Sequence, residues 1–148
     1  MVCTFFGHRN ATEAVREPLK KSILHLLKHE HVDMFLVGND GNFDFYVQCI
    51  LREMKEAQKG VHFQIVLSRP DEKSLSGNQM ATIFPEGLEK ALPRFAISKR
   101  NEWLLKKSSF VIAYVKHSFS NSDKWIKRAV KKGIQIINLA NFSDFTAS

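Results

Sequence analysis

The feature that most constrains the fold is a regular alternation of apolar runs with amphipathic segments. Short, nearly continuous apolar runs predict strands over residues 2–6, 34–37, 61–67, 110–115 and 134–139. Apolar residues at helical spacing between these runs predict helices over residues 17–30, 43–54, 97–107 and 122–132. Strands that are apolar on both faces are typical of parallel sheets covered by helices. The alternation therefore predicts an α/β protein with three layers, a Rossmann-like fold built on a five-stranded, mainly parallel sheet.

Residues 68–94 interrupt the alternation. This stretch is rich in proline, glycine and serine and has little periodicity, so it predicts a long irregular excursion with one helical turn near residues 85–87. Loops of this length in a compact domain are often functional. With 148 residues, the chain is expected to form a single domain over residues 1–148.

The charge and composition narrow the class of partner. The net charge is +7, which favours an anionic partner, but the basic residues are scattered, so a nucleic acid is not the expected one. No apolar run approaches the roughly 20 residues of a membrane helix, and residues 1–6 lack the features of a signal peptide. Cys3 and Cys49 lie within hydrophobic patterns, as buried reduced thiols do. A cytoplasmic protein with no membrane association is predicted.

Three polar loops follow three of the predicted strands. Gly7, His8 and Arg9 follow the first strand, a loop over residues 38–41 follows the second, and a loop over residues 117–123 follows the fourth. Parallel sheets bind ligands beyond the carboxyl ends of their strands, where the strand order reverses. The loops therefore predict a ligand site at one edge of the sheet.

Each loop offers groups that suit an anionic ligand. Gly7 allows the backbone to approach a ligand, and Arg9 offers a planar fork for phosphate or carboxylate. The second loop leads into a strong helix, whose first turn contains Asp44 as a cap or as an acceptor for a ribose hydroxyl. The candidate ligand-binding residues of the second and third loops are Gly38, Asn39, Asp40, Gly41, Asp44, Ser118, Ser120, Asn121 and Ser122.

Structural roles compete with this interpretation. Gly38 and Gly41 are typical of a tight turn, and Asp44 is typical of a helix cap. His8 is typical of a histidine at the edge of the core whose ring is hydrogen-bonded to the backbone. The last helix is expected to bury Ile126, Ala129 and Val130 and to present its lysines to solvent. What favours a ligand site is that three polar loops converge on one edge of the sheet.

No established catalytic or metal-binding motif is present. The sequence lacks the glycine-rich nucleotide-binding loops and the nucleophile elbow of hydrolases. His25 and His29 share a helix face, but no cysteine or carboxylate completes a ligand set at the right spacing, Glu30 aside. We therefore expect no catalytic set, no metal, and no cofactor other than a nucleotide-like ligand.

Several segments together resemble a known superfamily. They are Thr4-Phe5-Phe6-Gly7-His8-Arg9, Phe35-Leu36-Val37-Gly38 with Gly41-x-x-Asp44, Lys99-Arg100-Asn101-x-Trp103, and Val111-Ile112-Ala113-Tyr114-Val115. In this order they resemble the SLOG superfamily, and more closely its short bacterial YspA/YpsA-like members. The resemblance implies a Rossmann-like sheet with strand order 3-2-1-4-5. It also implies a pocket for a nucleotide or nucleotide-derived ligand, lined by Gly7, His8, Arg9, Gly38, Asp44, Arg100 and Asn101.

The loop over residues 117–124 departs from the pattern of the relatives. It contains no glycine, whereas hydrolases of the Lonely Guy type carry a glycine-rich loop followed by a glutamate, where this chain has Lys124-Trp125-Ile126. The sequence thus favours a sensing or regulatory protein over an enzyme. Two alternatives remain. One is a nucleoside-monophosphate glycosidic-bond hydrolase that uses His8, Asp40 or Asp44 as acid–base groups. The other is a protein-interaction module or homo-oligomer with a degenerate pocket.

Overall fold

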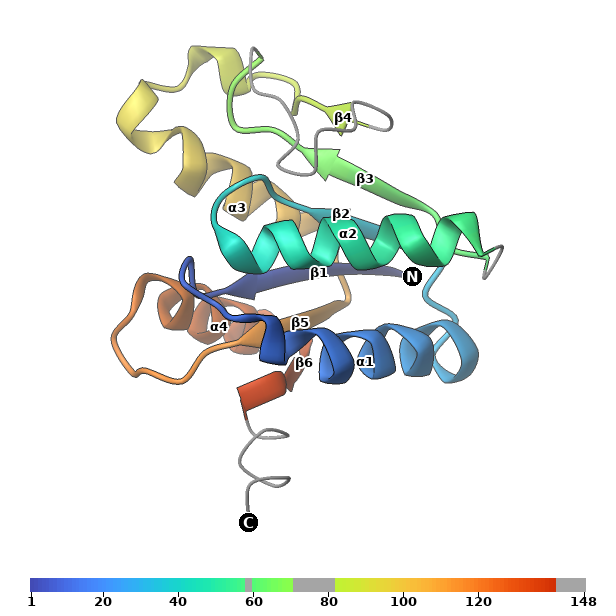
Figure 1. The fold of residues 1–148 in the computed structure, drawn as a ribbon. Coiled ribbons are helices and arrows are strands. Elements are labelled where there is room, and N and C mark those ends of the chain that lie inside the picture. The colour runs from blue at the N-terminus through green and yellow to red at the C-terminus, as the bar shows by residue number, and fades with distance from the viewer. Residues whose placement is uncertain (58–59, 71–81, 141–148) are drawn as a thin grey trace.

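A parallel sheet forms the centre of the molecule (Figure 1). The computed structural model describes residues 1–57, 60–70 and 82–140. The sheet has six strands in the order β4-β3-β2-β1-β5-β6, and every strand pair in it is parallel. The strands are β1 (Val2–Gly7), β2 (Met34–Val37), β3 (Phe63–Val66), β4 (Thr82–Ile83), β5 (Phe110–Tyr114) and β6 (Gln135–Asn138).

The predicted count of five strands is wrong, because the sheet has a sixth strand at its edge. The five expected strands keep the predicted order 3-2-1-4-5, and β4 adds to β3 through the pairs Ile65–Thr82 and Val66–Ile83. A two-residue strand is too short to produce a period in the sequence. Within the predicted excursion, residues 71–81 lie outside the described residues. The helical turn expected near residues 85–87 is a 3-10 turn over Leu88–Lys90.

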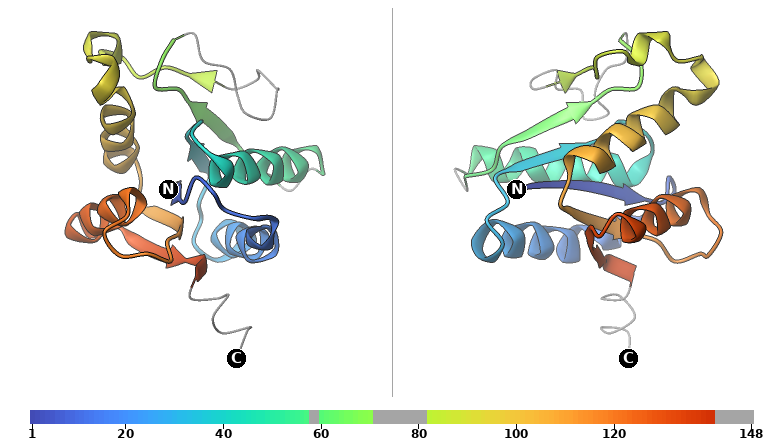
Figure 2. Two further views of the ribbon diagram at one scale, coloured as in Figure 1. Left: turned by 60° about the vertical axis from the view of Figure 1, so that its left-hand side comes forward. Right: turned by 180° about the vertical axis from the view of Figure 1, so that it is seen from behind.

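Helices cover both faces of the sheet, as predicted for three layers (Figure 2). The helices α1 (Arg16–His29) and α2 (Asn42–Glu56) lie on one face, and α3 (Ala96–Lys107) and α4 (Asn121–Lys131) lie on the other. Because side chains alternate along a strand, Phe5 joins the core under α1 and α2 while Phe6 joins the core under α3 and α4. The sheet is therefore buried on both sides, which explains its nearly continuous apolar strands.

The helix α4 is rotated relative to the expected orientation. Its buried residues are Trp125 and Ala129, whereas Val130 is 60% exposed, so the prediction that Val130 faces inward is wrong. Ile126 is only partly buried against the same core. Burying the large indole removes more apolar surface from water than burying a valine does. The indole stacks on Phe6, with 6.1 Å between ring centroids.

Both cysteines are free thiols, Cys3 in the core and Cys49 partly exposed. Burial raises the pKa of the Cys3 thiol, so this group stays protonated. In the described part of the chain, no helix combines the length and apolar character needed to cross a membrane.

Replacing Ser108 with alanine is expected to stabilise the fold by about 1 kcal/mol. Ser108 caps the carboxyl end of α3, and its Oγ is the one buried side-chain polar atom of the described residues with no hydrogen-bond partner. Urea unfolding of Ser108→Ala measures the change, with the exposed neighbour Ser109→Ala as the control that leaves stability unchanged. A clear loss of stability in Ser108→Ala would show that the hydroxyl has a stabilising partner.

Candidate functional site

A cavity of about 260 Å³ lies at the carboxyl end of β1, on the side of the sheet that carries α3 and α4. The chain leaves β1 toward α1 on one face and leaves β5 toward α4 on the other, so the cavity lies where the strand order reverses. Such a reversal is where open α/β sheets bind ligands. The structure brings together these predicted site residues around the cavity: Gly7, His8, Arg9, Gly38, Asp40, Asp44, Arg100, Asn101, Ser120, Asn121 and Ser122.

Three predicted site residues do not line this cavity. Asn39 is buried, and its Oδ1 accepts a hydrogen bond of 3.4 Å from the Gln48 side chain. Gly41 has a φ of 96°, and a Cβ there would lie 2.8 Å from the Arg9 Cα. Glycine at this position therefore serves the turn before α2. Ser118 is exposed on the loop before α4.

Other lining residues were not predicted from the sequence. They are Phe5, Phe6, Asn10, Ile97, Leu104 and Trp125. Positions 97, 100, 101 and 104 follow helical spacing on α3, so the Arg-Asn pair could have indicated Ile97 and Leu104 as lining residues. Trp125 is both buried and part of the cavity wall.

The most distinctive group of the site is the Arg100 side chain. Arg100 is 2% exposed, its Nε donates to the Asn101 Oδ1 at 3.1 Å, and its Nη1 donates to the Val66 carbonyl at 3.4 Å. Among the described residues it forms no ion pair, although the Asp44 Oδ2 and the Arg100 Cζ both lie about 3 Å from the position that a Gly38 Cβ would occupy. A buried cation without a paired anion is costly. This arrangement therefore favours an anion that enters the cavity.

Asp44 and Arg100 both pack closely against Gly38. A Cβ at Gly38 would lie 2.9 Å from the Asp44 Oδ2 and 3.0 Å from the Arg100 Cζ. Any larger side chain would push one of these two groups away, so the close approach requires glycine at this position. Both charged groups are thereby held beside the same end of β2.

Asp44 is a buried carboxyl in the first turn of α2. It is 8% exposed, and its Oδ2 accepts a hydrogen bond of 2.9 Å from the Asp40 backbone N–H. Burial raises the pKa of Asp44 to about 6, although the Arg100 charge and the Asp40 N–H both favour the ionised form. Perturbed carboxyls of this kind concentrate at functional sites.

Asp44→Asn is expected to make the protein about 2 kcal/mol more stable near neutral pH. The pKa of Asp44 rises from the ordinary 3.8 to about 6 on folding, so the folded protein binds this proton more tightly than the unfolded chain does. The carboxyl thus favours folding at low pH, and this contribution is lost as the pH rises from about 4 through about 6.

Urea unfolding of wild type and Asp44→Asn across this pH range measures the difference. The two proteins should converge near the acid end of the range. Glu56→Gln, a matched change at an exposed position of α2, is the control. An equal offset between Asp44→Asn and wild type at every pH would contradict the raised pKa.

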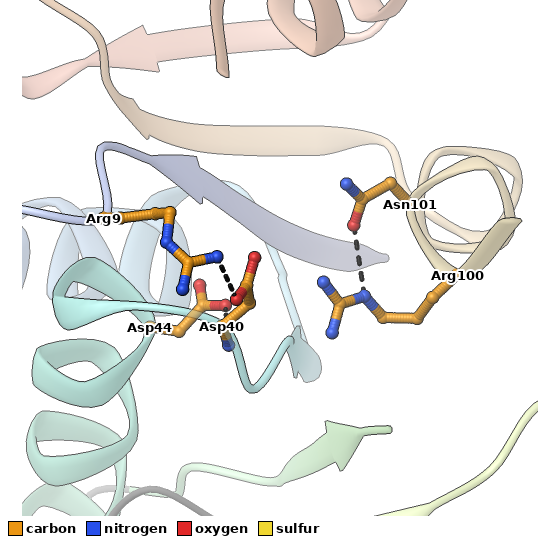
Figure 3. Close-up of polar contacts among 5 residues, drawn as sticks. All are labelled: Arg9, Asp40, Asp44, Arg100 and Asn101. Atoms are coloured by element: carbon orange, nitrogen blue, oxygen red, sulfur yellow. Dashed lines mark hydrogen bonds and ion pairs between the residues drawn. The ribbon is translucent and has the colours of Figure 1, made fainter. Parts of the chain in front are cut away.

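The mouth of the cavity contains an ion pair between Arg9 and Asp40. The Arg9 Nη1 contacts the Asp40 Oδ1, and the Arg9 side chain is 72% exposed (Figure 3). Exposed pairs of this kind contribute little to stability. Arg9 can therefore exchange Asp40 for an anionic group of a ligand at low cost.

His8 is fixed by the backbone. Its Nε2 accepts a hydrogen bond of 2.8 Å from the Lys116 N–H, which places the ring proton of the neutral imidazole on Nδ1. Burial and the nearby charges of His117 and Lys116 lower the pKa of His8. The expected alternative, a histidine satisfied by the backbone at the core edge, is confirmed, and the same ring also lines the cavity.

The loop before α4 uses one of its hydroxyls as a helix cap. The Ser120 Oγ accepts a hydrogen bond of 3.1 Å from the Asp123 N–H, and Asp123 in turn accepts one of 3.0 Å from the Phe119 N–H. This reciprocal capping fixes the start of α4. Asn121 and Ser122 lie in the first helical turn and line the cavity, where the helix dipole favours negative charge.

Within the described residues, no three histidine, cysteine, aspartate or glutamate side chains are grouped so that they could hold a metal ion. No protein-family model matches the chain, and no curated protein is significantly similar to it.

Proposed function

We propose that the protein binds a nucleotide or a nucleotide-derived small ligand in this cavity, and that it senses the ligand in the cytoplasm rather than transforming it. The observation that carries the proposal is the buried Arg100 guanidinium, which faces a cavity at the reversal of strand order and has no paired anion among the described residues. The resemblance of the sequence to the SLOG superfamily supports the same ligand class.

The chemistry of the cavity walls supports a ligand with an aromatic and an anionic part. Trp125 and Phe6 give one wall apolar aromatic surface, while Arg100 and the start of α4 favour negative charge. The volume of about 260 Å³ is slightly below the usual range of about 300–1,000 Å³ for ligand sites. It therefore suits a mononucleotide better than a dinucleotide.

Thermal unfolding with a panel of nucleotides, nucleoside phosphates and dinucleotides tests the proposal. A ligand that binds only the folded protein raises the midpoint, by the equivalent of about 2.7 kcal/mol at a hundredfold excess over Kd. We expect a mononucleotide to give the largest shift and Arg9→Ala to reduce it, because Arg9 lies at the cavity mouth. Arg16→Ala, which loses an ion pair to Glu53 on α2, is the control. Absence of a shift with every compound at millimolar concentration would refute the proposal.

The buried Asp44 favours a second candidate function. A carboxyl with a pKa of about 6 is suited to donate a proton to a leaving group near neutral pH, as glycosidic-bond hydrolysis requires. Release of free base from nucleoside monophosphates by wild type, lost in Asp44→Asn, would establish this activity. Tight binding without base release would leave the sensing function as the better account.

A further inference from the structure

We propose that the cavity binds an oxyanion on Arg100 together with one proton, which the Asp44 carboxylate takes up from solvent. This inference rests on the proposed ligand site and specifies how the site recognises charge. The anion would bind beside Gly38, because the side chains of Asp44 and Arg100 both lie close to the position that a Cβ of this glycine would occupy.

The geometry makes anion binding to Arg100 and protonation of Asp44 interdependent. The Asp44 Oδ2 and the Arg100 Cζ both lie about 3 Å from the point where a Gly38 Cβ would stand. An oxyanion that contacts the guanidinium must therefore lie close to the carboxyl as well. Two negative groups at such a distance in a water-poor site repel strongly, and protonation of one of them removes the repulsion.

The hydrogen bonds that hold Asp44 and Arg100 in place leave the carboxyl able to take up a proton and the guanidinium able to bind an anion. The Asp44 Oδ2 is occupied by the Asp40 N–H, which holds the carboxyl in place without neutralising it. The Arg100 Nε donates to the Asn101 side chain, and the Nη1 donates a long hydrogen bond of 3.4 Å to the Val66 carbonyl. The Nη end of the guanidinium is turned toward Asp40 and Asp44 (Figure 3). A carboxyl that has gained a proton also becomes a hydrogen-bond donor to the bound oxyanion.

The other charged groups around the cavity do not replace Asp44 as the proton acceptor. From the loop after β1, Arg9 pairs with Asp40, and His8 has its Nε2 occupied by the Lys116 N–H. The lining residues from the loop before α4 and from α4 itself are uncharged. Asp44 is thus the buried acid nearest to the bound anion, and its pKa, already raised to about 6, would rise further when the anion binds.

Calorimetric titration with inorganic sulfate tests the inference, because sulfate remains a dianion throughout the relevant pH range. Titrations in two buffers of different ionisation enthalpy give the number of protons taken up per sulfate bound. Near pH 7, we expect about one proton per sulfate, and an affinity that falls up to about tenfold per pH unit above the pKa of Asp44. In Asp44→Asn, we expect no proton uptake and an affinity that does not change with pH.

Two further variants separate the possible outcomes. Arg100→Gln should abolish sulfate binding, Arg100→Lys should retain it in part, and Glu56→Gln should behave as wild type. Uptake that persists in Asp44→Asn would assign the proton to another group of the cavity, such as His8 or Asp40, and overturn the inference, as would an absence of sulfate binding in wild type. A nucleotide that binds with no proton uptake would sustain the proposed function while refuting this inference. Proton-linked sulfate binding without any nucleotide binding would sustain this inference while refuting the proposed function.

Discussion

Gly7→Ala is expected to lower the free energy of unfolding by about 3 kcal/mol, near the upper end of the usual cost of overpacking. A Cβ at Gly7 would lie 2.3 Å from the Phe43 Cγ and 2.4 Å from its Cδ2, far inside contact distance. Phe43 is buried and stacks on Tyr114, so its ring has no free space into which it can move. The added methyl group must therefore displace either the end of β1 or the start of α2.

A double-mutant cycle distinguishes this clash from other effects of the substitution. Phe43→Ala removes the ring that the new methyl group would meet, so Gly7→Ala should cost much less in the Phe43→Ala background than in wild type. Urea unfolding of the four proteins gives the coupling energy. An equal cost of Gly7→Ala in both backgrounds would show that Phe43 is not what excludes a side chain at this position.

Arg100→Gln is expected to weaken binding of an anionic ligand at least about a hundredfold, the usual cost of truncating one member of a buried charge pair. The glutamine amide can still reach Asn101, but it carries no charge and presents fewer donors to the cavity. Calorimetry with the nucleotide that gives the largest thermal shift measures the loss. Without ligand, the loss of charge in Arg100→Gln should not lower the free energy of unfolding below that of wild type, because burying a guanidinium itself destabilises the folded protein.

Two comparisons show whether the loss arises from the site itself. Arg100→Lys keeps the charge but loses the planar fork, so its affinity should lie between those of wild type and Arg100→Gln. Arg16→Gln removes an arginine from the opposite face of the sheet and should leave binding unchanged. Affinity of Arg100→Gln within about threefold of wild type would mean that the buried guanidinium does not contact the ligand.

Much of the fold could be predicted because hydrophobic periodicity records which faces are buried. The five long strands and four helices each extend over enough residues to show a period, and their alternation implies the parallel sheet. The strand β4 has only two residues, and its place is decided by pairing with β3. The rotation of α4 was also missed, because the sequence pattern did not indicate that Trp125 outweighs Val130 in the core.

The location of the cavity could be predicted, but the packing and the charge states of its walls could not. Parallel topology places the ends of β1 and β2 at one edge, so the residues that follow them had to lie close together. Whether a polar residue faces the cavity depends on packing: Asn39 turns toward Gln48, whereas its neighbours Gly38 and Asp40 line the cavity. The raised pKa of Asp44 likewise follows from burial in the folded protein.

The most direct test of the account is a titration of ¹⁵N-labelled protein with nucleoside monophosphates, followed by two-dimensional NMR. If the cavity is a nucleotide site, the backbone amides of residues 7–9, 38–44 and 120–122 should shift together with one binding constant, while those of α1 remain unchanged. The same shifts should be lost in Arg100→Gln. Shifts confined to another surface, or no shifts at millimolar ligand, would contradict the assignment of this cavity as a nucleotide site.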